Sequence, residues 1–94
     1  MDKKIYLSDY FWKLIVTRNA MVGLFKILED IPEKKIILDF NKIEFMSRSC
    51  TDEYIKRKSG CEKKIKEINT SRNIMTMFLL VARQNKLNNK IITQ

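Results

Sequence analysis

The hydrophobic residues of the chain begin with two short runs separated by a turn-prone pair. Residues 5–7 are bulky strand formers, residues 8 and 9 are Ser and Asp, and a second apolar run occupies residues 11–16. On a strand, Trp12, Leu14 and Val16 would share one face, because side chains alternate along it. The pattern predicts a hairpin that opens the fold.

The next segment has helical spacing and is followed by a buried strand. Thr17 is a good N-cap, apolar residues recur every three or four positions from Met21 to Ile31, and Pro32 ends the run. Residues 34–40 then contain consecutive aliphatic side chains, which is typical of a strand covered on both faces. We expect this strand to be central in the sheet.

Two further helices and a third sheet strand are predicted in the second half. Ser49 is the expected N-cap of a helix that runs to about Ser59, with Asp52 and Glu53 in its first turn. Residues 65–68 suggest a strand, and residues 70 or 71 cap a last helix that reaches about residue 84. A final strand over residues 90–93 is only weakly indicated.

These elements predict one α/β domain over residues 1–94. Their order is strand, strand, helix, strand, helix, strand, helix. Short strands that alternate with helices favour a mixed β-sheet, here opened by the hairpin, with about three helices packed on it. The chain has 94 residues, of which 45% are hydrophobic, so nearly all the apolar side chains are needed for one core.

The composition excludes several kinds of enzyme. The chain has no histidine, the side chain that most readily transfers protons near neutral pH, and its two glycines form no phosphate-binding motif. Two cysteines without histidine are too few for a structural zinc site, and their spacing is not that of a redox pair. We therefore expect no catalytic residues, no cofactor and no metal.

The sequence gives no indication of a membrane segment. The longest apolar run, residues 77–82, is far shorter than the roughly 18–20 residues that cross a bilayer. The N-terminus lacks the apolar region of a signal peptide. We expect a cytoplasmic protein with reduced thiols.

Residues 5–86 resemble the STAS-like domains of unknown function found in bacteria and archaea, which are relatives of the anti-sigma factor antagonists. The best local motif is the strand Ile36 to Phe40, a turn, Ile43 and Phe45, and a serine-bearing loop that opens a helix. In those relatives the helix opens with Ser-Phe-Ala-Asp-Glu, which here reads Ser49-Cys50-Thr51-Asp52-Glu53. Two of these five positions differ.

This resemblance implies a non-catalytic regulator that binds another protein, such as an ATPase related to histidine kinases. In the antagonists a serine at the start of the second helix is phosphorylated by that partner. Aligning the apolar pair Phe45-Met46 places Arg48 at the phosphoacceptor position, and an arginine cannot accept phosphate. A shift of one residue places Ser47 or Ser49 there, and the sequence leaves both registers open.

The loop before the second helix is the main candidate site. Hydroxyls and a guanidinium gather where a helix N-terminus favours an anion. Three interpretations stay open: helix capping alone, phosphorylation of a hydroxyl, and binding of a partner's acidic group through Arg48. The candidate residues are Ser47, Arg48, Ser49, Thr51, Asp52 and Glu53.

A second candidate is a basic patch in the second half of the chain. Residues 48–94 carry eleven basic and four acidic side chains, and so hold most of the net charge of +8. The patch would bind nucleic acid through phosphates, bind an acidic partner, or simply be solvated. Its residues are Lys56, Arg57, Lys58, Lys63, Lys64 and Lys66.

The last helix is apolar on more than one face. Ile74, Phe78 and Val81 make a core stripe, whereas Leu79 and Leu80 extend the apolar surface further round. The second face would meet another chain, such as a second copy in a homodimer, or be covered by the hairpin or the C-terminal tail.

Overall fold

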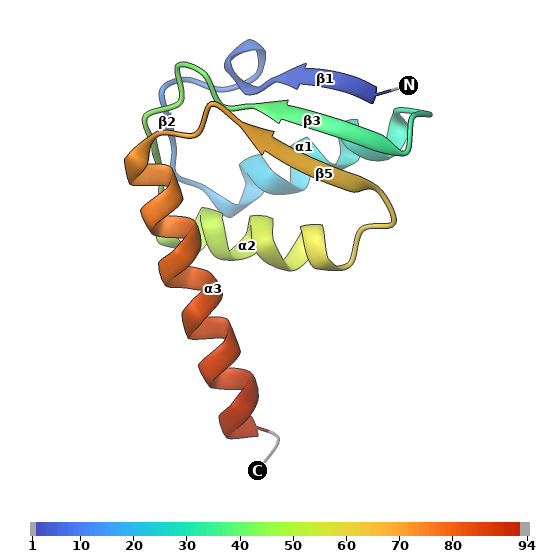
Figure 1. The fold of residues 1–94 in the computed structure, drawn as a ribbon. Coiled ribbons are helices and arrows are strands. Elements are labelled where there is room, and N and C mark those ends of the chain that lie inside the picture. Colours follow the sequence, from blue (N-terminus) through green and yellow to red (C-terminus); the bar gives the residue numbers. More distant parts are fainter. Residues whose placement is uncertain (1, 93–94) are drawn as a thin grey trace.

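The structure, a computed structural model, describes the backbone of residues 2–92 and the side chains of residues 2–85. Within this range the fold is α/β, with three α-helices and short parallel strands. The main sheet contains β1 (Asp2–Tyr6), β3 (Lys35–Asp39) and β5 (Lys64–Ile68), in the order β1-β3-β5. The segment predicted to be central is therefore the central strand (Figure 1).

The predicted N-terminal hairpin is wrong. A 3-10 helix, η1 (Leu7–Asp9), follows β1, and the amides of Tyr10 and Phe11 donate to the carbonyl of Leu7. Because Leu7 is buried in the core, the chain is carried away from β1 instead of turning back along it. The second strand, β2 (Leu14–Ile15), pairs in parallel with β4 (Phe45–Met46), a strand that the sequence did not suggest.

All the strand pairs in the described residues are parallel, so the predicted mixed sheet is also wrong. One helical crossover leads into β3, and a second leads from β3 toward β5. α1 (Arg18–Asp30) precedes β3, and α2 (Arg48–Ser59) precedes β5. This agrees with the rule that parallel strands need long connections.

The first helix matches its prediction closely. The amide of Ala20 donates to the hydroxyl of Thr17, which is the N-cap, and the helix ends just before Ile31 and Pro32. Its buried side chains are those of the predicted stripe: Met21, Leu24, Phe25 and Leu28.

The other two helices differ from prediction at their ends. The N-cap of α2 is Ser47, not Ser49, so Asp52 and Glu53 lie beyond the first turn. The hydroxyl of Ser71 caps α3 (Arg72–Ile92), as expected, but α3 continues well past residue 84. Residues 90–92 are therefore helical and not part of a strand, and residue 93 lies outside the described residues.

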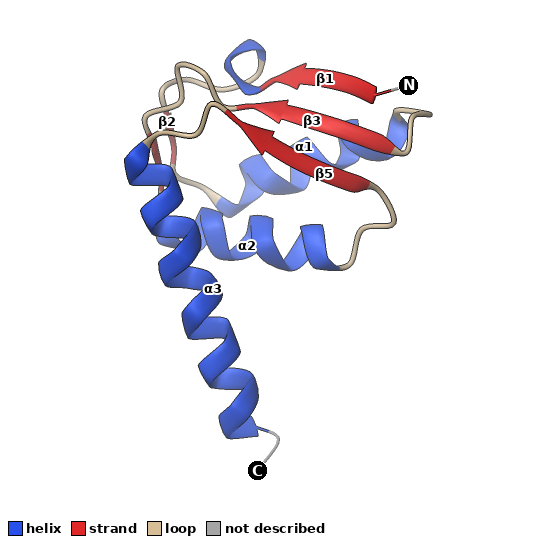
Figure 2. Ribbon diagram, viewed as in Figure 1, coloured by secondary structure: helices blue, strands red, loops and turns tan. Residues whose placement is uncertain are grey.

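The helices pack on one side of the main sheet (Figure 2). Ile5, Ile36 and Leu38 are buried on that side. An aromatic cluster fills the junction of sheet and helices, with centroid distances of 5.6 Å between Tyr54 and Phe78 and 5.8 Å between Phe25 and Tyr54. Among the described residues no α-helix covers the opposite face of the sheet, and α3 projects from the body (Figure 1).

Among the residues that the structure describes, no helix is both long and apolar enough to traverse a lipid bilayer.

Candidate functional site

Ser47 joins the two loops that meet at the start of α2. Its hydroxyl donates to the carbonyl of Val16 at 2.8 Å and accepts from the amide of Cys50 at 3.1 Å. The amide of Ser47 donates to the carbonyl of Ile15 at 2.8 Å. These bonds fix the predicted loop against β2. The N-cap of α2 is Ser47, and not Ser49 as the sequence predicts.

The hydroxyls and the guanidinium of this loop differ in accessibility. Thr51 is fully buried, and its hydroxyl donates to the carbonyl of Ser47 at 2.9 Å. Ser49 is half-buried, with its oxygen 3.3 Å from that of Ser47. Arg48 is exposed. Of the predicted loop residues, Arg48 and Ser49 are therefore accessible to solvent, whereas Ser47 and Thr51 hold the loop together.

The two acids of the motif bind the neighbouring helix. Arg18, at the start of α1, lies 3.8 Å from the carboxylate of Asp52 and 3.3 Å from that of Glu53. Lys56 pairs with Asp52 at 3.0 Å, and Arg57 pairs with Glu53 at 2.8 Å. Both carboxylates therefore have cationic partners within the fold.

The pKa of Asp52 reflects opposing effects. Partial burial acts to raise the pKa of this carboxyl, but hydrogen bonds from Lys56 and Asn85, with the charges of Lys56 and Arg18, lower it overall. Asp52 is thus held ionised, which suits an ion-pair partner and not a proton donor.

An exposed apolar stripe lies directly beside this loop. Tyr10, Trp12, Leu14 and Val16 alternate along the segment through β2 and all point to solvent. The side chain of Trp12 is 88% exposed, which is unusual for so large an apolar group. Phe45, the register partner of Leu14, is also exposed and extends the stripe onto β4.

The sequence carries a signal for this stripe, which is the alternation of Trp12, Leu14 and Val16. From the sequence alone this alternation predicts one face of a hairpin, not an exposed stripe. In the fold β2 has a single partner strand, and no helix covers these side chains among the described residues. The stripe and Arg48 together form what we call the β2–α2 surface, which consists of Tyr10, Trp12, Leu14, Val16, Phe45 and Arg48.

The predicted basic patch is not one surface. Lys56 and Arg57 are paired within α2, Lys58 pairs with Glu67 at 2.7 Å, and Lys63 donates to the backbone carbonyls of Ile31 and Glu33. Lys64 and Lys66 lie instead on the open face of β5. Four of the six predicted cations therefore have partners within the fold.

The carboxylate at the end of β3 has a structural role. Asp39 accepts from the amide of Asn41 at 2.9 Å and from the side chain of Asn69 at 3.0 Å. These donors, with Lys4 at 3.5 Å, outweigh burial and lower the pKa of Asp39. No second carboxylate is bonded to it among the described residues, so it forms no acid–base pair.

The thiols and the buried tyrosine do not form a reactive group. Burial raises the pKa of Cys50 to about 12, so this thiol stays protonated, whereas Cys61 is half-exposed. Burial, and then the charge of Glu67, raises the pKa of Tyr54, whose hydroxyl donates to that carboxylate.

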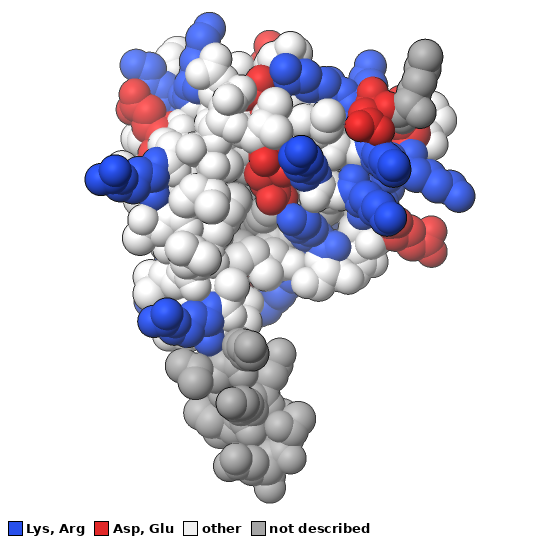
Figure 3. All heavy atoms as spheres, viewed as in Figure 1, with Lys and Arg blue, Asp and Glu red and all other residues white. Residues whose placement is uncertain are grey.

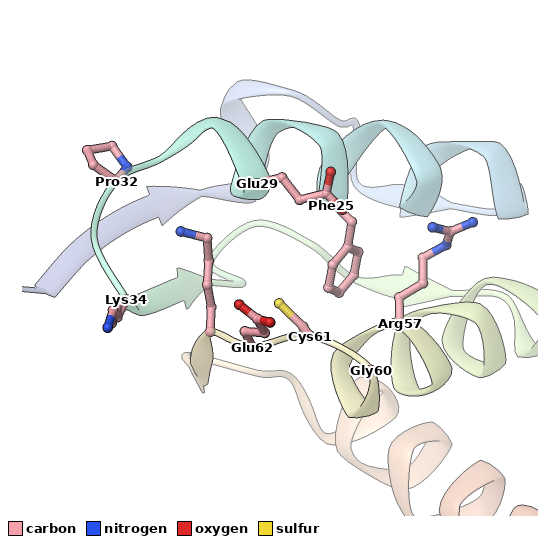
Figure 4. A pocket seen from close by; sticks show the side chains of 9 residues that line it. Phe25, Glu29, Pro32, Lys34, Arg57, Gly60, Cys61 and Glu62 are labelled. Carbon is pink, nitrogen blue, oxygen red and sulfur yellow. The ribbon is translucent and has the colours of Figure 1, made fainter.

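A hollow lies between the C-terminal part of α1 and the loop after α2 (Figure 4). Phe25 forms its floor, and Cys61 and Glu62 stand at its edge (Figure 4). Arg57 and Lys63, which line it, are already engaged with Glu53 and with backbone carbonyls. The lining therefore offers no convergent set of free polar groups.

Within the described part of the chain, no three side chains of the metal-binding types gather at one place. No protein-family model, curated protein or solved structure matches this chain. The STAS-like resemblance of the sequence accordingly stays a prediction.

Proposed function

We propose that this protein is a non-catalytic, STAS-like regulatory module that binds another protein through the β2–α2 surface, at the loop and helix that begin at Ser47. The observation that carries the proposal is the exposure of Trp12 on a stripe whose last residue, Val16, is bonded to Ser47 next to the exposed Arg48. Tryptophan and arginine dominate the binding energy of protein interfaces, because they combine large contact area with directional polar groups.

The surface also defines the chemistry of the partner. The partner would have an apolar groove that receives Trp12 and Leu14, and an acidic group that pairs with Arg48. A small pocket lined by Arg18, Arg48 and Ser49 continues the polar part of the surface toward α3. We propose that the partner is a cytoplasmic regulator, such as an ATPase related to histidine kinases, as the resemblance implies.

Ser49 is the preferred residue for a phospho-switch within this proposal. The hydroxyls of Ser47 and Thr51 both donate to backbone carbonyls, so modifying either would break the start of α2. A phosphate on Ser49 would lie near Arg18 and Arg48, although Asp52 in the same pocket opposes it.

The proposal is tested by measuring how a partner responds to two variants. Trp12→Ser and Arg48→Glu should each weaken the complex by at least tenfold, as expected for residues at the centre of an interface. Because both side chains are exposed, neither change should lower the melting temperature. Arg83→Glu reverses an exposed charge on α3 and should leave affinity unchanged.

The intrinsic fluorescence of the protein gives a second reading. Trp12 is the only tryptophan, so its emission reports burial of this one side chain. A blue shift on binding would support the β2–α2 surface. Binding without any shift, with full affinity in both variants, would place the interface elsewhere.

We further propose that a homodimer forms through α3. Met75, Leu79 and Leu80 are exposed on this helix, whereas Ile74 and Val81 face the core. The predicted hairpin does not cover them, because it does not exist, and α3 runs on as a helix instead of folding back. A two-fold axis would place the same apolar residues of both copies in contact.

A further inference from the structure

The open face of the main sheet carries three rows of side chains set by its register. Parallel pairing aligns Lys35 with Lys64, and it aligns Ile37 with Lys4 on one side and Lys66 on the other. Residues aligned in this way lie about 4.8 Å apart across the strands, and rows on one face are about 6.6 Å apart. The four lysines are all exposed.

This arrangement places like charges side by side, with four lysines and only two acids on the same face. Lys35 lies directly opposite Lys64, a pairing that destabilises a sheet. Among the described residues, neither of these side chains nor Lys66 forms an ion pair. Asp39 pairs with Lys4, and the other acid on this face, Asp2, stands at one end of the Lys35 row. The face therefore remains positive.

Figure 3 shows Lys and Arg side chains gathered over the region where β3 and β5 begin. Lys58 of α2 is held by Glu67 on the helix-covered face of β5, whereas Lys35, Lys64 and Lys66 of the open face form no ion pair among the described residues. An anionic ligand would relieve the repulsion between Lys35 and Lys64. Asp2 compensates this repulsion only on the β1 side of Lys35, and the charge that remains around Lys64 and Lys66 points to such a ligand.

The same face also offers apolar and aromatic contacts. Tyr6 is 45% exposed at the end of β1, and the ammonium of Lys4 lies 5.0 Å from the centre of its ring. Ile68 is half-buried in the same row as Tyr6, and Ile37 is half-buried in the next row. Single-stranded nucleic acids bind to surfaces that combine cations for phosphates with an aromatic ring and apolar side chains for unstacked bases.

We infer that the open face of the β1-β3-β5 sheet binds single-stranded nucleic acid. Lys35, Lys64 and Lys66 contact the phosphates, and Tyr6 stacks on a base. This inference is independent of the protein partner, because the β2–α2 surface lies on the other, two-stranded sheet. An acidic peptide would satisfy the charges but would leave Tyr6 without a stacking partner.

The test measures the affinity of a fluorescent dodecamer of deoxythymidine at several salt concentrations. Replacing Lys35, Lys64 and Lys66 together by Gln should reduce the slope of log affinity against log salt by about two, since each phosphate contact contributes about 0.7. The affinity of this variant at 0.1 M salt is then roughly 100-fold lower than that of the wild type, and the difference shrinks toward 1 M salt. The variant Tyr6→Leu should weaken binding about fivefold or more with an unchanged slope.

Two controls separate this face from general electrostatic attraction. The triple variant of Lys13, Lys26 and Arg83 to Gln removes the same charge from exposed positions outside the main sheet and should keep nearly full affinity. In the absence of ligand, Lys35→Gln and Lys64→Gln should each keep or raise the melting temperature, because like-charge repulsion is removed. A lower melting temperature would show that these lysines serve the fold instead.

Several results would overturn the inference. They are equal losses in the two triple variants, stronger binding of a duplex of the same length, and absence of binding to the dodecamer at 0.1 M salt. Tighter binding of a poly-glutamate peptide or of phosphatidylserine vesicles through the same lysines would assign the face to an acidic protein or to a membrane surface.

Discussion

At the scale of single residues, Ser47 has the largest structural role in the candidate site. One hydroxyl caps α2 and also binds the carbonyl of Val16, so it connects two segments that lie 31 residues apart. Ser49, which the sequence favoured as the cap, bonds only to Ser47 through its oxygen. The two serines therefore make a matched pair for a mutational test.

Ser47→Ala should lower the free energy of unfolding by about 1 kcal/mol, because the cap of α2 is lost. Ser49→Ala should lower it by less, since no backbone amide depends on that hydroxyl in the described contacts. Urea denaturation of both variants measures the difference. Equal effects of the two substitutions would contradict the assignment of the cap.

The two thiols should react at very different rates. Cys50 is buried with a pKa raised to about 12, whereas Cys61 is half-exposed. A thiol reagent should modify one cysteine per native chain and two after denaturation. Cys61→Ser should abolish the native reaction, while modification that persists in this variant would show that the core opens around Cys50.

At the scale of elements, Asp39 connects the ends of three strands. Its carboxylate meets Lys4 of β1, sits at the end of β3, and accepts from Asn69 after β5. Its pKa is lowered in the folded state, so it stabilises the fold above its ordinary pKa of about 3.9. That stabilisation is lost as the pH falls through the depressed folded value.

Asp39→Asn should therefore flatten the loss of stability below about pH 4, while lowering stability near neutral pH. The measurement is the free energy of unfolding from denaturant melts between pH 7 and pH 2. Asp9→Asn, in the exposed turn of η1, is the control and should follow the wild-type profile. A profile for Asp39→Asn parallel to wild type would show that this carboxylate does not titrate on unfolding.

At the scale of the whole molecule, the three exposed features lie on different parts of the fold. The stripe of Trp12 is on the two-stranded sheet, the free lysines are on the open face of the main sheet, and Leu79 is on α3. The proposed regulator, nucleic acid and second copy would therefore not compete directly for the same side chains.

Sedimentation equilibrium tests the proposed homodimer. Leu79→Glu should convert a concentration-dependent dimer into a monomer, because a charge would be placed in the apolar contact. Trp12→Ser should leave the dimer intact, since it changes only the β2–α2 surface. A wild-type monomer at all concentrations, or a dimer unaffected by Leu79→Glu, would rule out α3 as the contact.

The sequence by itself determined the local elements, because their signals come from neighbouring residues. Thr17 and Pro32 bound α1, the aliphatic run of β3 indicated its central position, and Gly60 marks the end of α2. The spacing of short strands and helices likewise gave the α/β class. The ends of α1 and α2 do not depend on which strand pairs with which.

Only the tertiary structure decided the pairing, and with it the surfaces. Burial of Leu7 in the core separates β1 from β2, which turns an expected hairpin into two parallel sheets and leaves Trp12 in solvent. The six cations that are near one another in sequence are divided between internal ion pairs and an open sheet face. Strand pairing brings together residues that are far apart in the chain, and so do several of the ion pairs. Local sequence patterns therefore do not predict these contacts.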